Sequence, residues 1–250
     1  MILQTHHLSR HFGGLKAVSD VSISIKKNAI HSILGPNGAG KTTLFNLITG
    51  AIPPAGGTVH FMGQEITGWS PDKLAKIGVV RTFQRTSIFK KLGVLENVSL
   101  AVRSRRNMNY SIRVPKALSE DIRNEAMSYL DDVGLTKFER VMADNLAHGY
   151  QRALDIAIGL ALKPKLILMD EPLAGMSRGD REGIAQLIIK LRNELGLTVV
   201  MVEHDVGMVM KLSDTITVMQ YGHVIAEGKP EAIRDDENVK KAYLHGSFAI

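Results

Sequence analysis

The segment at residues 35–43, which reads GPNGAGKTT, constrains this chain more than any other part of it. It fits the pattern G-x-x-x-x-G-K-[ST], a glycine-rich loop whose backbone N–H groups turn toward bound phosphates. The apolar run 30–34 before it is typical of a strand, and residues 44–48 after it are typical of a helix, which is the context that the pattern requires. A glycine-rich turn that matches by chance is the alternative, and this context argues against it.

This phosphate loop predicts contacts with a nucleotide. Lys41 is expected to reach the β- and γ-phosphates, and the Thr42 hydroxyl is expected to ligate magnesium. The start of the following helix adds partial positive charge that favours phosphate. The predicted phosphate-binding residues are Gly35, Pro36, Asn37, Gly38, Ala39, Gly40, Lys41, Thr42 and Thr43.

Composition narrows the class of protein. The chain has 250 residues, of which 44% are hydrophobic and 22% charged, as in ordinary globular proteins. It lacks cysteine, which excludes disulfides and thiolate metal sites. No apolar stretch is long enough to span a bilayer, and the N-terminus lacks the layout of a signal peptide. We therefore expect an intracellular protein.

The charge balance is basic, with 31 Lys and Arg against 25 Asp and Glu. This excess allows nucleic acid, an anionic membrane surface or a nucleotide as partner. The densest basic segment contains Arg103, Arg105, Arg106, Arg113 and Lys116, with Tyr110 as its one aromatic residue. One aromatic residue is little for a base-stacking surface. A solvated connecting segment is one interpretation, and contact with lipid head groups or a membrane partner is the other.

The apolar runs predict an α/β core. Continuous apolar residues at 166–169 and 199–202 indicate strands buried on both faces, hence a parallel sheet covered by helices. Between these runs, residues 180–195 have the apolar spacing of a helix that stops at Gly196. Alternation at Val21, Ile23 and Ile25 favours a half-exposed strand.

The region at residues 89–159 differs from the rest of the chain. Candidate helices at 94–102 and 118–133 flank Pro115, and no strand pattern occurs there. We interpret it as a helical subdomain inserted into a single domain, 1–250, whose core is formed by residues 1–88 and 160–250. Short strands at 215–218 and 224–227, followed by a helix near 237–244, are expected to complete the chain.

Three of the predicted strands end in residues suited to nucleotide hydrolysis. The first ends in the phosphate loop, the second in Asp170 and Glu171, and the third in Glu203 and His204. Ligands bind beyond the carboxyl ends of parallel strands, so these groups are expected to converge. Asp170 would then orient magnesium and Glu171 would accept a proton from the attacking water. His204 would bind the γ-phosphate. A solvated acidic pair and a simple helix start are the alternatives.

These residues, with others, resemble the nucleotide-binding subunit of an ABC transporter over nearly the whole chain. Gln84 in RTFQ resembles the family's Q-loop, and LAHGYQR at 146–152 resembles its signature. LAGMS at 173–177 is similar to the D-loop, and His204 is similar to the switch histidine. The resemblance implies an α/β P-loop NTPase core with a mostly parallel sheet, an N-terminal antiparallel β subdomain and an inserted α-helical subdomain.

The resemblance also implies roles for single residues. Phe12 would stack on adenine, a core aromatic being the alternative. Gln84 would contact magnesium and water and link the site to a membrane partner, which we expect to insert a helix into a nearby groove; a merely exposed glutamine is the alternative. The signature would bind ATP held by a second subunit. The signature residues are Leu146, Ala147, His148, Gly149 and Tyr150, and the D-loop residues are Ala174, Gly175, Met176 and Ser177.

The chain departs from the family pattern at the signature, which usually reads LSGGQ. Ala147 lacks the hydroxyl that would donate to the partner's γ-phosphate, a hydrogen bond worth about 1 kcal/mol. We expect weaker ATP sandwiching rather than its loss. Tyr150 replaces the usual glutamine, and Ser177 stands where the D-loop usually has Asp or Asn. These changes leave open how fast the protein hydrolyses ATP and whether both sites of a dimer are equally active.

Three segments resemble the ATPases of branched-chain amino acid importers: FGGLKAV at 12–18, VEHDV at 202–206 and YGHVIAEG at 221–228. DEPLAGM at 170–176 is similar to the related urea and amide importers. The resemblance implies an ATPase that uses ATP and Mg2+ to power import of such a solute. It would lie on the cytoplasmic face of the inner membrane with permease subunits and a second ATPase subunit, homo- or heteromeric, and would serve a substrate-binding protein indirectly.

Other functions stay open from the sequence. The ATPase of a lipid or lipopolysaccharide exporter is a close alternative. A soluble ABC ATPase acting on nucleic acid usually carries a coiled-coil insertion or two fused cassettes, which this chain lacks, so no nucleic acid is expected as partner. A regulatory module without turnover is opposed by Lys41, Asp170, Glu171 and His204.

Overall fold

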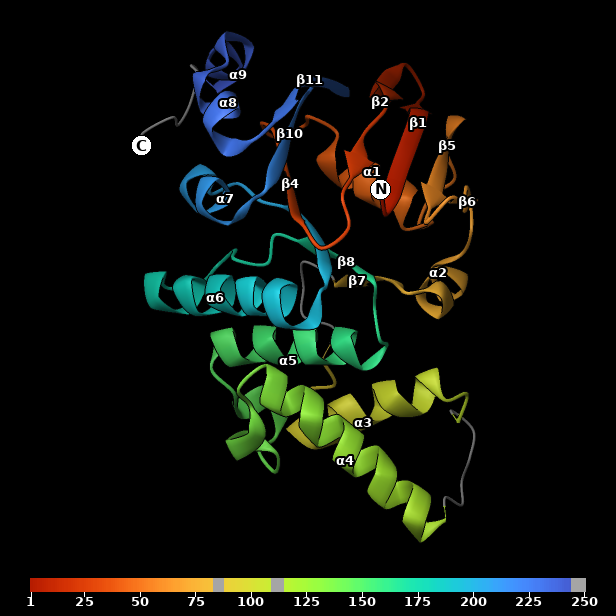
Figure 1. The fold of residues 1–250 in the computed structure, drawn as a ribbon, viewed down its shortest axis with the longest axis vertical. Helices are drawn as coiled ribbons and strands as arrows, with labels where there is room; N and C mark the ends of the chain where they lie inside the picture. The colour runs from red at the N-terminus through yellow and green to blue at the C-terminus, as the bar shows by residue number, and fades with distance from the viewer. Residues whose placement is uncertain (83–87, 109–114, 244–250) are drawn as a thin grey trace.

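A six-stranded sheet forms the centre of the molecule (Figure 1). The computed structural model describes residues 1–82, 88–108 and 115–243. Neighbouring strands of this sheet are parallel except for the last pair, β10 and β11, which are antiparallel. In spatial order the strands are β11 (His223–Gly228), β10 (Thr215–Gln220), β4 (Ile30–Leu34), β9 (Thr198–Val202), β8 (Leu166–Asp170) and β7 (Val79–Thr82).

The central strands are buried on both faces, as their continuous apolar runs predict. In β8, Ile167 and Met169 pack into one hydrophobic cluster, whereas Leu166 and Leu168 pack into another. Such alternation between two cores is what a parallel sheet covered on both sides requires. The predicted strands at 30–34, 166–169 and 199–202 are therefore confirmed.

A second, antiparallel sheet covers one of these faces. Its strands are β1 (Leu3–Phe12), β2 (Leu15–Val21), β3 (Ser24–Ile25), β5 (Gly56–Phe61) and β6 (Gln64–Glu65). Helix α1 (Lys41–Ile48) packs between the two sheets, because Phe45 and its apolar neighbours share one cluster with residues of both. This N-terminal sheet is the antiparallel β subdomain that the family resemblance implies.

The predicted strand over Val21, Ile23 and Ile25 is confirmed in its alternation but not in its continuity. All three residues are buried and Ser22 is exposed, as in a half-exposed strand, but the ladder is interrupted between β2 and β3. A side chain takes over there, because the Ile23 N–H donates to the Thr5 hydroxyl at 3.1 Å. The His7 N–H likewise donates to the Ser22 hydroxyl.

Most of the other helices cover the opposite face of the central sheet or extend away from it, whereas Leu74 of α2 packs into the cluster of the N-terminal sheet (Figure 1). Helix α5 lies between α6 and the α3–α4 pair. Between residues 89 and 159, the described residues form helices, turns and one isolated bridge. The helices are α2 (Pro71–Ile77), α3 (Val94–Arg105), α4 (Lys116–Asp132), α5 (His148–Ala161), α6 (Arg178–Leu195), α7 (Val206–Leu212), α8 (Pro230–Asp235) and α9 (Glu237–Tyr243), with 3₁₀ turns at Thr136–Phe138 and Ala143–Asn145.

The helix boundaries differ slightly from those expected. Helix α6 begins two residues early because the Ser177 hydroxyl accepts the Asp180 N–H as an N-cap. The predicted helix near 237–244 is described to Tyr243, and Leu244 lies outside the described residues. Burial raises the pKa of Tyr243 to about 12, and a hydrogen bond from the backbone of Gly35 opposes that rise. The last described helix thus contacts the start of the phosphate loop.

Two arginines of the basic segment are not solvated connectors. Arg105 and Arg106, at the end of α3, each bind Glu125 of α4 at 2.6 Å. The interpretation of this segment as a solvated connection is therefore wrong for both residues, because the Glu125 carboxylate of the neighbouring helix pairs with them. Arg113 lies outside the described residues. In the described part of the chain, no helix combines the length and apolarity that crossing a bilayer takes.

Candidate active site

The phosphate loop joins the carboxyl end of β4 to α1. Gly40 has φ +99°, and a Cβ at this position would lie 2.2 Å from the Ala17 carbonyl oxygen, so only glycine fits. Helix α1 begins at Lys41, and no side chain of the described residues caps it. The first backbone N–H groups of a helix have no partner within it, so they can bind an anion here.

Lys41 lies within this loop, with its ammonium on backbone oxygens. Its Nζ donates to the carbonyl oxygens of Gly35 at 2.6 Å and Pro36 at 3.0 Å, and the residue is only 5% exposed. Burial lowers the pKa of Lys41, and the negative charges of Glu171 and Asp170 oppose that change. The ammonium therefore lies close to both predicted acidic residues without forming an ion pair that closes the site.

The three strand ends converge as predicted, because β4, β9 and β8 are adjacent and parallel. Glu171 directly follows β8, where its N–H donates to the Val202 carbonyl of β9. His204 follows β9, and its Nε2 lies 2.7 Å from Oε1 of Glu171, a hydrogen-bond distance. Glu171 has φ +47°, a left-handed backbone that turns the chain off the strand.

A cavity of about 390 Å³ joins these groups. Residues 37–43 of the phosphate loop line it, and Glu171, His204, Phe12 and Tyr221 line it as well. The arrangement offers backbone amides and an ammonium for phosphates, a carboxylate for a water proton and an aromatic wall for a base. The structure therefore brings together most of the residues predicted to bind ATP within the chain itself, whereas the signature and D-loop residues do not line this cavity.

Phe12 lies at the end of β1 and is 46% exposed, so the alternative of a core aromatic is wrong. The Arg10 guanidinium lies 5.0 Å from its ring centroid. Leu15 and Tyr221 are also exposed at the cavity wall. Such an exposed aromatic ring can stack on a planar base.

Asp170 lies at the end of β8 and is buried. Its Oδ2 accepts a hydrogen bond from Arg81 Nη2 at 2.6 Å, whereas its Oδ1 accepts none from the described residues. A carboxylate oxygen and the Thr42 hydroxyl are hard oxygen donors of the kind that Mg2+ takes, together with water and phosphate oxygens. These two residues fit the predicted metal, and Gln84, the third predicted ligand, lies outside the described residues.

The signature segment lies at the start of α5 and does not line this cavity. Ala147, His148 and Tyr150 are exposed, whereas Leu146 is buried. Gly149 packs closely: a Cβ there would lie 2.9 Å from Oδ1 of Asp180 in α6. Most of the signature is thus exposed at the surface and does not line the nucleotide cavity of its own chain.

The structure gives partial accounts of two departures from the family pattern. The Tyr150 ring packs against Phe138, with centroids 4.7 Å apart, which places it over the 3₁₀ turn. Ser177, where an acidic or amide residue is usual, caps α6 instead. Of the other D-loop residues, Ala174 and Gly175 are exposed and Met176 is partly buried.

Comparison with known proteins decides the family. Residues 18–174 match the ABC transporter family. The chain belongs to this family. Residues 223–244, which cover β11, α8 and α9, match the family described as branched-chain amino acid ATP-binding cassette transporter.

Relatives of this ABC protein extend over the whole chain. It is 41% identical to the high-affinity branched-chain amino acid transport ATP-binding protein BraF of Pseudomonas aeruginosa, with 97% of each chain covered. It is 37% identical to the corresponding protein LivG of Escherichia coli, with the same coverage. A crystal structure of the ADP conformation of an ABC transporter cassette has a TM-score of 0.87 at 32% identity, covering 98% of this chain and 99% of the other.

These relatives confirm the predicted fold class and family. The protein is an ATP-binding subunit of an ABC transporter and an ATPase that drives transport. The cassette resembles further solved structures, including a dimeric cassette in a post-hydrolysis state bound to ADP and Pi, with a TM-score of 0.75 at 29% identity, covering 92% of this chain and 99% of that one.

Sequence reasoning missed the roles of Arg81, Arg152 and Glu203 at the ABC site. Arg152 of α5 donates to the carbonyl oxygens of Asp170 at 3.1 Å and Pro172 at 3.3 Å. Glu203 accepts the N–H groups of Leu173 at 2.7 Å and His204 at 3.2 Å, and burial raises its pKa while these bonds oppose the rise. A charged residue within the apolar stripe of α5 was the available signal for Arg152.

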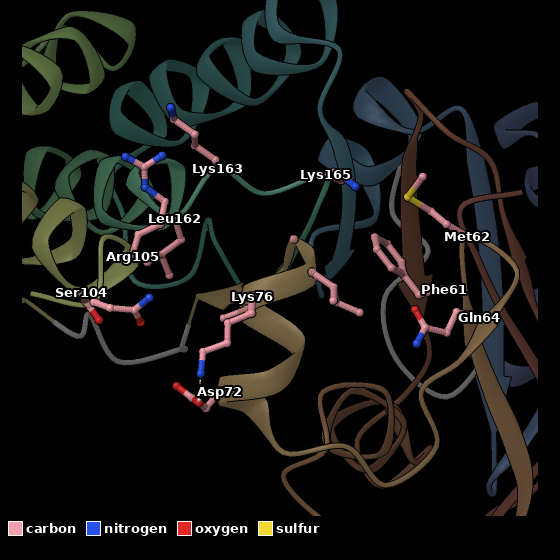
Figure 2. A pocket seen from close by; sticks show the side chains of 14 residues that line it. Phe61, Met62, Gln64, Asp72, Lys76, Ser104, Arg105, Leu162, Lys163 and Lys165 are labelled. Atoms are coloured by element: carbon pink, nitrogen blue, oxygen red, sulfur yellow. Dashed lines mark ion pairs between the residues drawn. The ribbon is translucent and has the colours of Figure 1, made fainter.

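A larger cavity, of about 580 Å³, lies elsewhere (Figure 2). It opens between α2, the β5–β6 turn and the end of α3, and Lys76, Arg105, Lys163 and Lys165 surround it. Lys165 immediately precedes β8, so this cavity lies near the amino ends of the strands, whereas the phosphate loop lies at the carboxyl ends. No described residue predicted for the ATP site lines it.

Proposed function

We propose that this ATPase powers the import of branched-chain amino acids. The observation that carries the proposal is the match of residues 223–244 to the branched-chain amino acid cassette family, beside relatives named for that transport that cover 97% of the chain. Exporter ATPases and nucleic-acid-acting ATPases do not occur among these named relatives, so neither alternative gains support from them.

The chain's own residues would bind ATP and direct its hydrolysis. The backbone amides of the phosphate loop and Lys41 would hold the phosphates, and Phe12 would stack on the base. Bound Mg2+ would neutralise charge on the phosphate oxygens. Thr42, Asp170 and Gln84 are the residues proposed to hold it.

Glu171 is proposed as the general base, because its carboxylate follows β8 at the cavity wall and can take a proton from the attacking water. His204 binds this carboxylate through Nε2. The same nitrogen cannot serve Glu171 and a γ-phosphate oxygen at full strength. Contact of His204 with the γ-phosphate would therefore release the Glu171 carboxylate for the water.

The protein is proposed to work on the cytoplasmic face of the inner membrane with integral permease subunits. A second ATPase subunit, identical or related, would complete each ATP site through its exposed signature residues. Support comes from relatives named as transport proteins and from the dimeric cassette that the fold resembles. A substrate-binding protein would act indirectly, through the permease, and we propose no nucleic-acid partner.

The general-base role is tested by the ATPase activity of the purified Glu171→Gln protein. General bases contribute about 100-fold or more to rate, so turnover should fall by at least that factor while ATP still binds. Glu182→Gln, an exposed change on α6, is the control and should leave turnover unchanged. Equal activities of wild type and Glu171→Gln would contradict the assignment.

The transport role is tested by uptake of labelled leucine in cells that carry wild type or Glu171→Gln in place of the native chain. We expect uptake only with wild type, and mass spectrometry of proteins co-purified from membranes should identify a permease and a paired ATPase. Equal leucine uptake with both chains, alongside intact ATPase activity of wild type, would show that the substrate class is wrong.

A further inference from the structure

Arg81 connects three elements of the ATP site. It lies in β7, whose register places it opposite Leu168 of β8, two residues before Asp170. Its side chain is 12% exposed. One terminal nitrogen, Nη2, donates to Asp170 Oδ2 at 2.6 Å, and the other, Nη1, donates to Asn46 Oδ1 at 2.6 Å and Thr49 Oγ1 at 3.4 Å.

Asn46 lies in the last turn of α1, the helix that begins with Lys41 and Thr42, and Thr49 is its C-cap residue. The guanidinium therefore fixes the position of the Asp170 carboxylate relative to the helix that carries Thr42, another predicted metal-binding residue. Phe45 of the same helix lies beneath it, with the guanidinium carbon 5.9 Å from the ring centroid. These contacts hold one planar group between β8 and α1.

The Asp170 carboxylate uses its two oxygens differently. Oδ2 is committed to Arg81, and Oδ1 accepts no hydrogen bond from the described residues. A carboxylate held at one oxygen presents the other in a fixed direction. Outer groups that orient ligating carboxylates in this way commonly contribute about 10- to 100-fold to metal affinity.

We propose that Arg81 is a positioning residue that sets Asp170 for Mg2+ by tying its carboxylate to α1. This inference rests on the proposed function, in which Asp170 and Thr42 hold the metal. The proposal depends on the planar guanidinium, because its two terminal nitrogens donate to two different elements, α1 and β8. A lysine would keep the charge but could not make both contacts in this geometry.

The positive charge of Arg81 has the opposite effect on Mg2+ affinity, so the two effects can be told apart by the direction of the change. A cation beside Asp170 also repels Mg2+, so a residue acting only through its charge would weaken metal binding, and removing it would strengthen that binding. If Arg81 acts by position, both Arg81→Met and Arg81→Lys weaken the metal's contribution.

The test measures the affinity of a fluorescent ATP analogue as a function of Mg2+ concentration, and again in EDTA. In Arg81→Met and Arg81→Lys, the half-saturating Mg2+ concentration should rise about tenfold or more. The affinity in EDTA should stay within about twofold, because the phosphate loop is untouched. Arg105→Met is the matched control: Arg105 is 22% exposed and binds its carboxylate at the same 2.6 Å, but in the α3–α4 pair.

The outcomes separate the two proposals. A wild type whose affinity does not depend on Mg2+ would refute the proposed metal site itself. A Mg2+-dependent wild type with folded Arg81 variants that match it, or an Arg81→Met protein that needs less Mg2+, would refute only the role of Arg81. Asp170→Asn combined with Arg81→Met should need no more Mg2+ than Asp170→Asn alone, and an additive loss would overturn the pathway through Asp170.

Discussion

The charged cluster around Glu125 and the ATP site around Lys41 differ in how their charged side chains are paired. In the α3–α4 pair, Glu125 accepts hydrogen bonds from Arg105, Arg106 and Tyr129 and forms an ion pair with Lys163. Burial pushes the pKa of Glu125 up, but bonds from Arg106, Lys163 and Arg105 outweigh it and hold the pKa at about 2. All four of these side chains contact the same carboxylate, that of Glu125.

At the ATP site, by contrast, Lys41 binds two backbone carbonyls and no carboxylate of the described residues. Phosphate oxygens can replace carbonyl contacts without breaking an ion pair. The difference teaches that a closed cluster of opposite charges serves stability, whereas a cation held by neutral oxygens beside an open cavity is ready for an anionic ligand. Substitutions at the ATP site should therefore lower ATP affinity more than stability, and substitutions in the α3–α4 cluster should do the reverse.

The largest contrast is expected for Lys41→Ala. It removes a cation that can make two charge-assisted bonds to phosphate, so ATP affinity should fall by about 100-fold or more. The free energy of unfolding should change by less than about 1 kcal/mol, because only contacts to loop carbonyls are lost. Titration with a fluorescent nucleotide and thermal unfolding measure the two effects. An ATP affinity equal to that of wild type would break the comparison, and Lys211→Ala, an exposed change, serves as reference.

Glu125→Gln should show the reverse pattern. It leaves three cations around a neutral amide, which we expect to lower the free energy of unfolding by about 2 kcal/mol without changing ATP affinity. A weakened ATP affinity in a folded Glu125→Gln protein would show that the two regions are not separate.

The pH dependence of this effect follows from the lowered pKa. Glu125 has an ordinary value of 4.5 and about 2 in the folded protein, so its stabilisation is complete above about pH 4.5 and is lost as the pH falls toward 2. The stability gap between wild type and Glu125→Gln should therefore narrow over that window. Chemical unfolding at a series of pH values measures it, and a gap that stays constant would refute the cause.

The smallest expected effect is that of Phe12→Ala. Stacking of a base on an aromatic ring contributes about 1–3 kcal/mol, so ATP affinity should fall about tenfold. Inorganic tripolyphosphate, which has no base, should compete equally well in both proteins. Phe89→Ala, a change at another exposed aromatic, is the control. Equal ATP affinities of wild type and Phe12→Ala would remove Phe12 from the site.

The parts of this fold that local pattern encodes were predictable. Buried parallel strands and the phosphate loop carry strong signals, because continuous apolar runs and glycines at fixed spacing have few other uses. Strand β1 was missed, since polar and basic residues interrupt its apolar positions Leu3 and Leu8. Its pairing shifts register twice with β2 and once with β5.

The site was predictable where residues act at strand ends, and not where they act through distant partners. Arg81 and Asp170 are 89 positions apart, and Arg152 and Asp170 are 18 apart on different elements. Contacts between residues so far apart in the chain leave no local spacing pattern from which they could be predicted. Family resemblance supplied Phe12, which chemistry alone could not separate from a core aromatic.

The buried Arg152 has a mechanical consequence. Arg152 hydrogen-bonds α5, the helix whose exposed start carries the signature, to the backbone carbonyl oxygens of Asp170 and Pro172. In the proposed dimer, a displacement of that helix by a neighbouring cassette would have to shift the end of β8 or break these hydrogen bonds. One guanidinium would thereby couple the cassette's own nucleotide cavity to the signature surface that is proposed to complete its partner's site.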